Sequence, residues 1–376
     1  MKRFFSYSIL SFFLLLLPTG QASANNNDSI RLSLLTCAPG EEIYSLFGHT
    51  AIRYENSSQG IDVVFNYGLF SFNTPNFIFR FSLGETDYQL GATDYERFAA
   101  EYAFFGRSVW QQTLNLTDEE KTELIRLLQE NYRPENRVYR YNFFYDNCAT
   151  RPRDKIEESI AGKVIYPAEP QDGSLTFRDI VHQYCKGHPW ARFGIDLCIG
   201  SEADQPITQR QMMFAPFYLM DAFDGAQIKG DSIQRPLITA NELIVDATPE
   251  PDESDWMPTP LQCSLLLFIL TAAATIYGIR RRTGLWGIDL FLFGIAGIVG
   301  CVLAFLALFS QHPAVSSNFL LLVFHPGQLL FLPYIIYCVR KGKKCWYLTL
   351  NLAVLTLFIV LFPVIPQRFD FAVVPL

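Results

Sequence analysis

Hydrophobic residues are unevenly distributed along the chain, and four long apolar stretches occupy its C-terminal part. These stretches cover residues 261–279, 285–309, 319–338 and 346–364. Each is long enough for a helix to cross about 30 Å of hydrocarbon. The third contains Pro326 and Pro333, and a spanning helix tolerates such breaks only where neighbouring helices satisfy the freed backbone groups. The pattern predicts an all-α transmembrane bundle of four helices within residues 261–376.

Basic residues between the apolar stretches indicate how the bundle is oriented. Arginine and lysine clusters follow the first and third stretches, at Arg280, Arg281, Arg282, Arg340, Lys341, Lys343 and Lys344. The loop at 310–318 contains no lysine or arginine. Because positive loops stay in the cytoplasm, we expect the preceding domain and the C-terminal tail to lie on the outer side. A segment rich in proline and acidic residues, 251–260, would link that domain to the bundle.

The N-terminus has the features of a secretory signal peptide. Lys2 and Arg3 precede an apolar run at 12–17, and Ala22-Ser23-Ala24 is a small-residue cleavage site. We therefore expect residues 1–24 to be removed on export. Export of the segment that follows agrees with the orientation that the basic loops indicate.

Residues 25–250 form the expected exported domain, and their pattern is mixed α and β. Residues 50–54 and 61–67 have the composition of short strands, and a polar turn joins them. Thr117 and Glu120 form a capping box, and the leucines that follow give the predicted helix an apolar face. The domain is therefore expected to be of the α+β class.

Composition excludes several classes of function. Hydrophobic residues make up 50% of the chain, and its net charge is −7. Nucleic-acid binding needs an excess of lysine and arginine on one face, so no nucleic-acid partner is expected. The sequence has no paired Cys-x-x-Cys elements and no glycine-rich phosphate loop, so we expect neither a metal nor a cofactor.

The segment with the most reactive chemistry surrounds Cys148. It follows Asn147, which is suited to helix capping, and precedes a helical stretch at 154–160. The partial positive charge of a helix N-terminus lowers the pKa of a thiol and favours the nucleophilic thiolate, and Arg151 would add to the effect. Pro152 indicates instead that Cys148 lies on a short turn before the regular helix, which would weaken the effect.

A thiolate that attacks a carbonyl needs a general base, and histidine is the usual one. The expected exported domain contains His49, His182 and His188. His49 follows Gly48 at the start of a predicted strand, where a strand end can aim the imidazole at a neighbouring helix terminus. Residue chemistry alone leaves two simpler alternatives open, a buried structural thiol at Cys148 and an ordinary histidine at His49.

The expected exported domain contains three further cysteines. Cys185 and Cys198 are close in sequence and would meet an oxidising compartment, which leaves a disulfide between them open. Cys37 follows a stretch that resembles a lipoprotein processing site, but Arg31 and the polar residues before it argue against a lipid anchor. A bridge between Cys37 and Cys148 is the competing alternative to a catalytic thiol.

Several blocks of sequence are more specific together than any one motif. They are residues 45–53, 65–68, 134–137, 141–153 and 189–197. In this order they resemble the Lnb family of lipoprotein N-acyltransferases, which join an N-terminal periplasmic domain to a multi-span membrane domain. The resemblance covers nearly the whole mature chain. It implies a multi-pass protein of the bacterial inner membrane, with the N-terminal domain and the C-terminal tail in the periplasm.

The resemblance implies a permuted papain-like fold, similar in arrangement to lecithin:retinol acyltransferase and NlpC-type enzymes. In that arrangement the histidine strand precedes the cysteine helix, as His49 precedes Cys148 here. The resemblance thus implies that Cys148 is the nucleophile and His49 its base. A third polar residue orients the imidazole in such sites. Asn66 fits that place, and Tyr67 or Asp62 fits nearly as well.

The reaction that the resemblance implies is an acyl transfer through a thioester on Cys148. The donor would be a phospholipid, and the acceptor the N-terminal diacylglyceryl-cysteine amine of a lipoprotein. Candidate substrate-binding residues are Arg53, Tyr67, Asn147, Arg151, His312 and Asn318. The two arginines could hold a phosphate or carboxylate, although a surface ion pair fits each equally well. His312 and Asn318 would line an access path for lipid at the outer end of the bundle.

Two other classes of function stay open at this point. A hydrolase of the same fold, a periplasmic thioesterase or peptidoglycan peptidase, would pass the acyl group from Cys148 to water. A non-enzymatic envelope sensor or assembly protein would use the exported domain only for binding.

Overall fold

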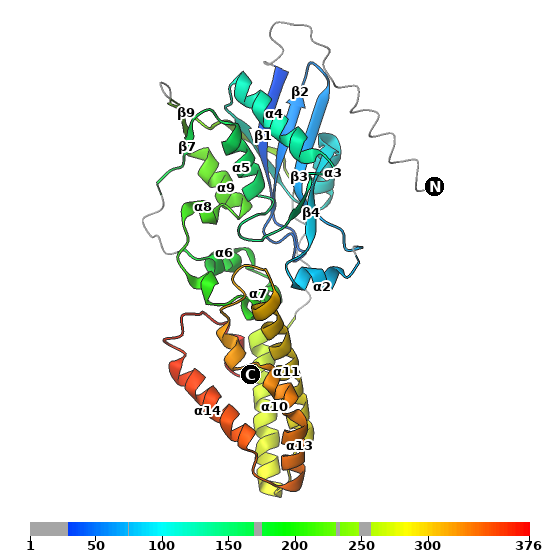
Figure 1. The fold of residues 1–376 in the computed structure, drawn as a ribbon, viewed down its shortest axis with the longest axis vertical. Helices are drawn as coiled ribbons and strands as arrows, with labels where there is room; N and C mark the ends of the chain where they lie inside the picture. The colour runs from blue at the N-terminus through cyan, green and yellow to red at the C-terminus, as the bar shows by residue number, and fades with distance from the viewer. Residues whose placement is uncertain (1–28, 74, 169–174, 231–233, 248–256) are drawn as a thin grey trace, which may run out of the picture.

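The computed structural model describes residues 29–73, 75–168, 175–230, 234–247 and 257–376. The predicted signal peptide and most of the predicted linker at 251–260 lie outside these residues. In the described parts, a domain built around a β-sheet stands on one end of a helical bundle (Figure 1). The N-terminal sheet-rich domain followed by a helical region agrees with the predicted order of the two parts.

An antiparallel sheet of seven strands runs through the first domain, in the order β10-β5-β1-β2-β3-β4-β6. Its strands are β1 (Ile30–Cys37), β2 (His49–Asn56), β3 (Ile61–Leu69), β4 (Asp87–Asp94), β5 (Val109–Leu114), β6 (Val138–Arg140) and β10 (Ile238–Val245). A second sheet contains β7 (Lys163–Ile165), β8 (Gln227–Lys229) and β9 (Gln234–Pro236). The strands predicted at 50–54 and 61–67 are confirmed as β2 and β3.

Helices cover both faces of the large sheet. The helices described in this domain are α2 (Phe77–Ser82), α3 (Tyr95–Phe104), α4 (Asp118–Tyr132), α5 (Thr150–Ser159), α6 (Phe177–Tyr184), α7 (Pro189–Cys198), α8 (Gln209–Met212) and α9 (Pro216–Asp224), with a 3-10 turn η3 (Ser201–Asp204). Because strand side chains alternate, Ile52 and Phe65 pack against α4, α5 and α9, whereas Ala51 and Val64 pack against α3. The sheet therefore separates two apolar cores.

The predicted capping box at the start of α4 is confirmed. The Thr117 side chain accepts a hydrogen bond from the N–H of Glu120, and the Glu120 carboxylate accepts one from the N–H of Thr117. These two bonds satisfy two backbone donors at the start of the helix. The local sequence therefore predicted where this helix begins.

A buried arginine joins the domain to the C-terminal tail. Arg178 on α6 is fully buried and bonds Asp196 on α7 at 2.6 Å and Asp204 in η3 at 2.8 Å. Arg368 in the tail donates to the same Asp204 at 3.0 Å. Because a buried charge is tolerated only when it is paired, this network fixes α6, α7 and the tail relative to one another.

The bundle begins with two long apolar helices, α10 (Pro260–Arg281) and α11 (Trp286–Phe309). By length and composition, both can cross a membrane. A helix of this length spans about 33 Å, so the arginines that end α10 lie far from the domain, which α10 meets at its start. Trp190 on α7 marks that junction, where its indole N–H donates to the Pro258 carbonyl at 2.9 Å.

The third predicted stretch is broken into separate helices. It forms η4 (Phe319–Leu322), α12 (Pro326–Leu330) and α13 (Leu332–Lys341), with a bend of 72° before α13. Pro326 and Pro333 stand in the first turns of α12 and α13, where a missing N–H removes no helical bond. The Gln328 side chain donates to the Val323 carbonyl at 2.8 Å, which satisfies one backbone group at the break.

The fourth helix is shorter than the predicted stretch at 346–364. It is α14 (Trp346–Leu361), with 16 residues. Pro363 follows closely, and proline cannot continue a helix because it lacks the N–H that the next turn requires. In the described part of the chain, two helices reach spanning length, or three if the bent pair is counted as one span.

Glycines allow α11 to pack directly against the backbone around α12. A Cβ on Gly300 would lie 2.4 Å from the backbone nitrogen of His325, and one on Gly297 would lie 2.6 Å from that of Leu329. Small residues let membrane helices approach closely. This contact therefore depends on the absence of side chains at both positions.

We expect Gly300→Ala to destabilise the bundle by about 1–3 kcal/mol, because the new methyl group meets backbone that has no room to move. Thermal unfolding of the detergent-solubilised full chain should show a lower midpoint. Gly287→Ala on the same helix is the matched control, since no atom lies within 4 Å of its Cβ position. Equal midpoints for the two variants would contradict this packing.

Candidate active site

The pairing of β2 with β3 does not reach the first two residues of β2, His49 and Thr50. The last pair of this ladder is Ala51 with Asn66. Beyond it β3 is irregular, and Gly68 has a φ of 89°, a left-handed conformation that glycine adopts without steric cost. The other edge of His49 and Thr50 is paired with β1. A group from another part of the chain must therefore satisfy the free edge of these two residues.

Cys148 occupies this place at the end of the ladder. A Cβ on Gly68 would lie 3.5 Å from the Cβ of Cys148, an ordinary packing distance. The backbone N–H of Thr50 donates a hydrogen bond to the Cys148 thiol. Thr50 follows His49 directly, so the sulfur lies beside the strand end that carries His49. The His49 side chain pairs with Cys37 on the face of the sheet that α3 covers, whereas Cys148 packs against the core on the α5 side, so the described part of the chain shows no contact between the imidazole and the sulfur.

His49 is held by an amide from the neighbouring strand. Its Nε2 lies 3.0 Å from Oδ1 of Asn66. With the amide oxygen as acceptor, Nε2 carries the proton and Nδ1 keeps the lone pair. Among the hydrogen bonds of the described residues, none involves Nδ1 of His49. The imidazole is therefore oriented at one nitrogen and free to act as a base at the other.

The other two candidates for the orienting residue have different partners. The Tyr67 hydroxyl donates to Asn131 at 2.8 Å, inside the core on the α4 side. Asp62 accepts two hydrogen bonds from Arg53, at 2.8 and 2.7 Å. Arg53 lies four residues from His49 along β2, about 13 Å away. Of the sequence alternatives for contact with the imidazole, the structure thus selects Asn66.

Asn147 shapes the turn that carries the cysteine. Its Oδ1 accepts hydrogen bonds from the N–H groups of Ala149 and Thr150, and its amide donates to two backbone carbonyls, each 2.8 Å away. Helix α5 begins only at Thr150, so Cys148 lies on the turn before it, as Pro152 indicated. All the polar groups of the Asn147 side chain are used in this turn, which gives the residue a structural role.

The predicted lowering of the Cys148 pKa is wrong for the free protein. Burial raises the pKa of the Cys148 thiol to about 11, and hydrogen bonds from the backbone N–H groups of Thr50 and Cys148 offset this only in part. Asn147 already satisfies the first N–H groups of α5, so the helix start does not stabilise the thiolate. Burial lowers the pKa of His49 to about 4, against the raising effect of its bond to Asn66. At neutral pH both groups are therefore uncharged.

Arg151 is neutralised by a neighbour. Its guanidinium forms two hydrogen bonds with Asp146, at 2.6 and 2.7 Å, and lies 3.5 Å over the ring of Tyr139. Arg53 is paired with Asp62 in the same two-bonded manner. For both arginines, the structure has the ion pair that the sequence left open in place of a phosphate or carboxylate site.

Three tyrosines form an aromatic wall beside the sulfur, and sequence reasoning missed them. A Cβ on Gly68 would lie 3.9 Å from Cε2 of Tyr141 and 4.0 Å from the hydroxyl of Tyr139. Tyr88 stacks on Tyr141 with ring centroids 4.3 Å apart. The only sequence signal is the alternation of Tyr139 and Tyr141 before the cysteine turn. Tyr88 comes from β4 and joins them only in the folded chain.

The remaining polar candidates lie elsewhere. His312 Nε2 donates to the Phe81 carbonyl at 2.6 Å, and the Asn318 amide donates to the Leu197 carbonyl at 2.7 Å. Both residues therefore bind the bundle to the first domain. The alternative base His182 is bound to the Asp196 carboxylate at 2.8 Å.

All eight cysteines of the chain are free thiols in the structure. The disulfide that the sequence left open between Cys185 and Cys198 is therefore absent, and so is the competing bridge from Cys37 to Cys148. Cys37 is fully buried in β1. Within the described residues, no group of three or more His, Cys, Asp or Glu side chains could hold a metal ion.

The raised pKa of Cys148 predicts how the thiol reacts in the absence of substrate. Only the thiolate is nucleophilic, so the rate of Cys148 alkylation by iodoacetamide should rise about tenfold per pH unit between pH 7 and 10. Peptide mass spectrometry of the detergent-solubilised full chain measures this rate for Cys148 alone. A rate that is constant from pH 6 to 8 would instead indicate a preformed thiolate.

Comparison with known families follows the two-part architecture. The model of the Lnb N-terminal periplasmic domain matches residues 20–182, and that of the Lnb transmembrane domain matches residues 252–376. Neither the curated proteins nor the solved structures contain a match. The two matches follow one another in the order of the sheet-rich domain and the helical bundle. The chain therefore belongs to the Lnb family and is an inner-membrane protein with a periplasmic domain and a transmembrane domain.

Proposed function

We propose that this chain is a lipoprotein N-acyltransferase that carries an acyl group on Cys148 from a phospholipid to the N-terminal amine of a diacylated lipoprotein. Family membership supports the class of reaction. The observation that carries the mechanism is the placement of the Cys148 thiol at the strand end formed by His49 and Thr50.

A permuted papain-like arrangement is part of this proposal. The histidine strand β2 precedes the cysteine in the chain, and Cys148 stands just before α5, which packs against the sheet. Asn66 on the adjacent strand holds Nε2 of the imidazole. These three positions reproduce the order of base, orienting amide and nucleophile that the resemblance implies.

In the first half-reaction, Nδ1 of His49 takes the thiol proton as the sulfur of Cys148 attacks the ester carbonyl of the phospholipid. The bond between the carbonyl carbon and the ester oxygen then breaks. The imidazolium returns its proton to that oxygen, and a lysophospholipid leaves. Because the resting pair is neutral, proton transfer accompanies the attack and does not precede it.

Two backbone N–H groups lie beside the nucleophilic sulfur. The N–H of Thr50 and the N–H of Cys148 both reach the sulfur. The hydrogen bonds of the cysteine turn use the N–H groups of Asn147, Ala149 and Thr150. The N–H of Cys148 is thereby left for the oxygen of a tetrahedral intermediate, a contribution that typically accelerates acyl transfer by about 10²–10³.

In the second half-reaction, the lipoprotein amine attacks the thioester carbonyl, and His49 accepts a proton from the amine nitrogen. The bond between the carbonyl carbon and the sulfur breaks, and the proton passes to the departing sulfur. Tyr139 and Tyr141 lie beside the Cys148 thiol, and Tyr88 stacks on Tyr141. These rings support transfer to an amine over hydrolysis by limiting the access of water.

The orientation in the membrane is likewise proposed from charge and geometry. The first domain contacts the loop at 310–318 and the tail after α14, and the basic residues after α10 lie at the other end of that helix. With positive residues in the cytoplasm, the domain and the tail face the periplasm. Cys148 would then serve the outer leaflet, where both lipid substrates keep their acyl chains.

The proposal predicts a covalent intermediate on one cysteine. Incubation of the purified full chain with phospholipid should give an acyl adduct on Cys148 that hydroxylamine removes, as measured by intact mass. Cys148→Ala should lose the adduct and at least 10³-fold of the transfer to a diacyl lipopeptide, whereas Cys198→Ala should keep both. Release of free fatty acid with no triacylated lipopeptide would contradict a transferase and indicate a hydrolase.

Asn66 should act by positioning His49, and two substitutions separate this role from a structural one. Asn66→Ala should lower kcat by about tenfold or more at all pH values, because the imidazole loses its orienting partner. Asn66→Asp should keep activity at high pH but move the acid limb of the kcat profile to higher pH, since a carboxylate raises the pKa of the imidazolium. Identical pH profiles for Asn66→Asp and the unsubstituted chain would rule out this contact in catalysis.

A further inference from the structure

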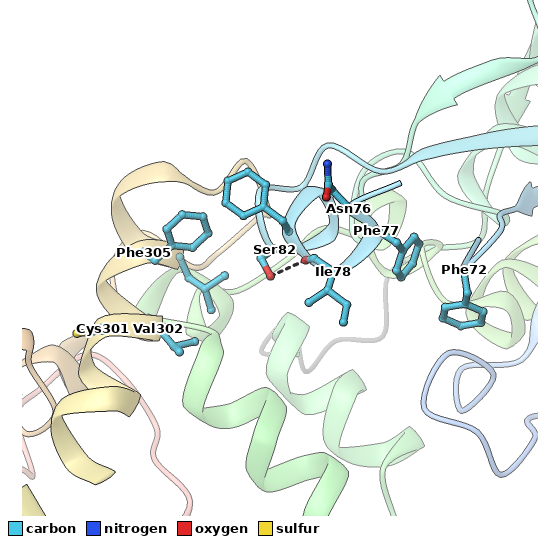
Figure 2. Close-up of a pocket in the computed structure, with 10 residues that line it drawn as sticks. Phe72, Asn76, Phe77, Ile78, Ser82, Cys301, Val302 and Phe305 are labelled. Atoms are coloured by element: carbon cyan, nitrogen blue, oxygen red, sulfur yellow. Dashed lines mark hydrogen bonds between the residues drawn. The ribbon is translucent and has the colours of Figure 1, made fainter. Parts of the chain in front are cut away.

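An apolar groove lies between α2 and the end of α11 that meets the first domain. Its volume is about 890 Å³. Phe77, Ile78 and Phe79 line one side, and Val302 and Phe305 line the other (Figure 2). The rings of Phe79 and Phe305 are 6.0 Å apart. The groove is therefore formed jointly by the periplasmic domain and a membrane helix.

Helix α2 exposes apolar side chains that water would not favour. None of its residues is buried, and Ile78 and Phe79 are 80% and 58% exposed. Its one charged residue, Arg80, turns to Asp87 at 2.7 Å. Contiguous exposed apolar surface of this kind indicates contact with a membrane or a ligand.

The end of the bundle fixes α2 in place. His312, in the loop after α11, donates to the Phe81 carbonyl at 2.6 Å, and the Gln311 N–H donates to the Leu83 carbonyl at 2.9 Å. Because α11 belongs to the transmembrane domain and is long enough to cross the bilayer, the residues of its last turns lie at the edge of the hydrocarbon. The groove therefore opens toward lipid chains.

A continuous series of aromatic rings leads from the groove to the sulfur. Phe72 and Phe77 at the groove lie 4.8 and 5.9 Å from Phe70, measured between ring centroids, and Phe70 lies 5.1 Å from Tyr88. Tyr88 stacks on Tyr141 at 4.3 Å. Tyr141 and Cys148 both contact the Cβ position of Gly68. The series contains no charged side chain, so it offers an apolar route between the two places.

We propose that this groove binds an acyl chain of the donor phospholipid, and that the aromatic series leads the attached ester to Cys148. The proposal rests on the proposed function and adds to it the site at which the donor is held. The occupant is an acyl chain because both walls are apolar and one wall is a membrane helix. The headgroup would stay outside the groove, on the polar side of the ester.

The first half-reaction tests the groove without the acceptor. Val302→Trp fills the groove from the α11 side, and Val360→Trp on α14 is the matched control because Val360 is also exposed, at 68%, and does not line the groove. In nanodiscs of long-chain phospholipid with no lipopeptide, Val302→Trp should lower the rate of thioester formation on Cys148 at least tenfold. Val360→Trp should leave the rate unchanged, and both variants should react normally with p-nitrophenyl acetate, which needs no groove. Equal thioester rates for the two variants would overturn the proposal.

A binding measurement separates failure of the groove from failure of the proposed function. In the Cys148→Ala protein, a phospholipid with a diazirine at the end of one acyl chain should label the peptide that contains residues 77–82. Adding Val302→Trp should reduce this labelling at least fivefold, and adding Val360→Trp should not. Unchanged labelling with Val302→Trp would reject the groove whatever the chemistry of Cys148. Labelling that Val302→Trp reduces, together with no thioester on Cys148 in the unsubstituted chain, would support the groove and reject only the transferase.

Discussion

The site depends on one unsatisfied position in a β-ladder. Where β3 turns away at Gly68, the edge of β2 at His49 and Thr50 has no strand partner, and a backbone N–H in the interior must find an acceptor. The sulfur of Cys148 is that acceptor. The same defect in the ladder thus holds the thiol, exposes an N–H group beside it and leaves the end of the histidine strand open.

The consequences of this arrangement extend from the site to the membrane. Burial raises the pKa of Cys148 and lowers that of His49, and so keeps both the thiol and the imidazole neutral. A neutral site costs little to cover with apolar rings, and those rings continue to the groove at α11. A resting pair of thiolate and imidazolium would be destabilised beside apolar rings. Because the resting pair is neutral, the site tolerates the apolar surroundings that a route for lipid needs.

The sequence predicted what local patterns control. The strands around His49 and Asn66 followed from their composition and the polar turn, and the start of α4 followed from Thr117 and Glu120, because each signal lies within a few residues. The pKa of Cys148 could not be predicted, since it depends on burial by parts of the chain that meet Cys148 only in the fold. The ion pairs of Arg53 and Arg151 stayed undecided for the same reason, and the length of α14 was overestimated because hydropathy averages over Pro363. The pairing of Cys148 with His49 as nucleophile and base came from the family resemblance, since sequence spacing does not show which distant residues meet in the fold.

The most direct test is an experimental structure of the full chain with an acyl group trapped as a thioester on Cys148. The account predicts that Nδ1 of His49 lies within about 4 Å of the sulfur, with Nε2 still bonded to Asn66. It also predicts that the thioester oxygen faces the N–H groups of Thr50 and Cys148. An imidazole that stays on the opposite face of the sheet, out of reach of the acylated sulfur, would contradict it.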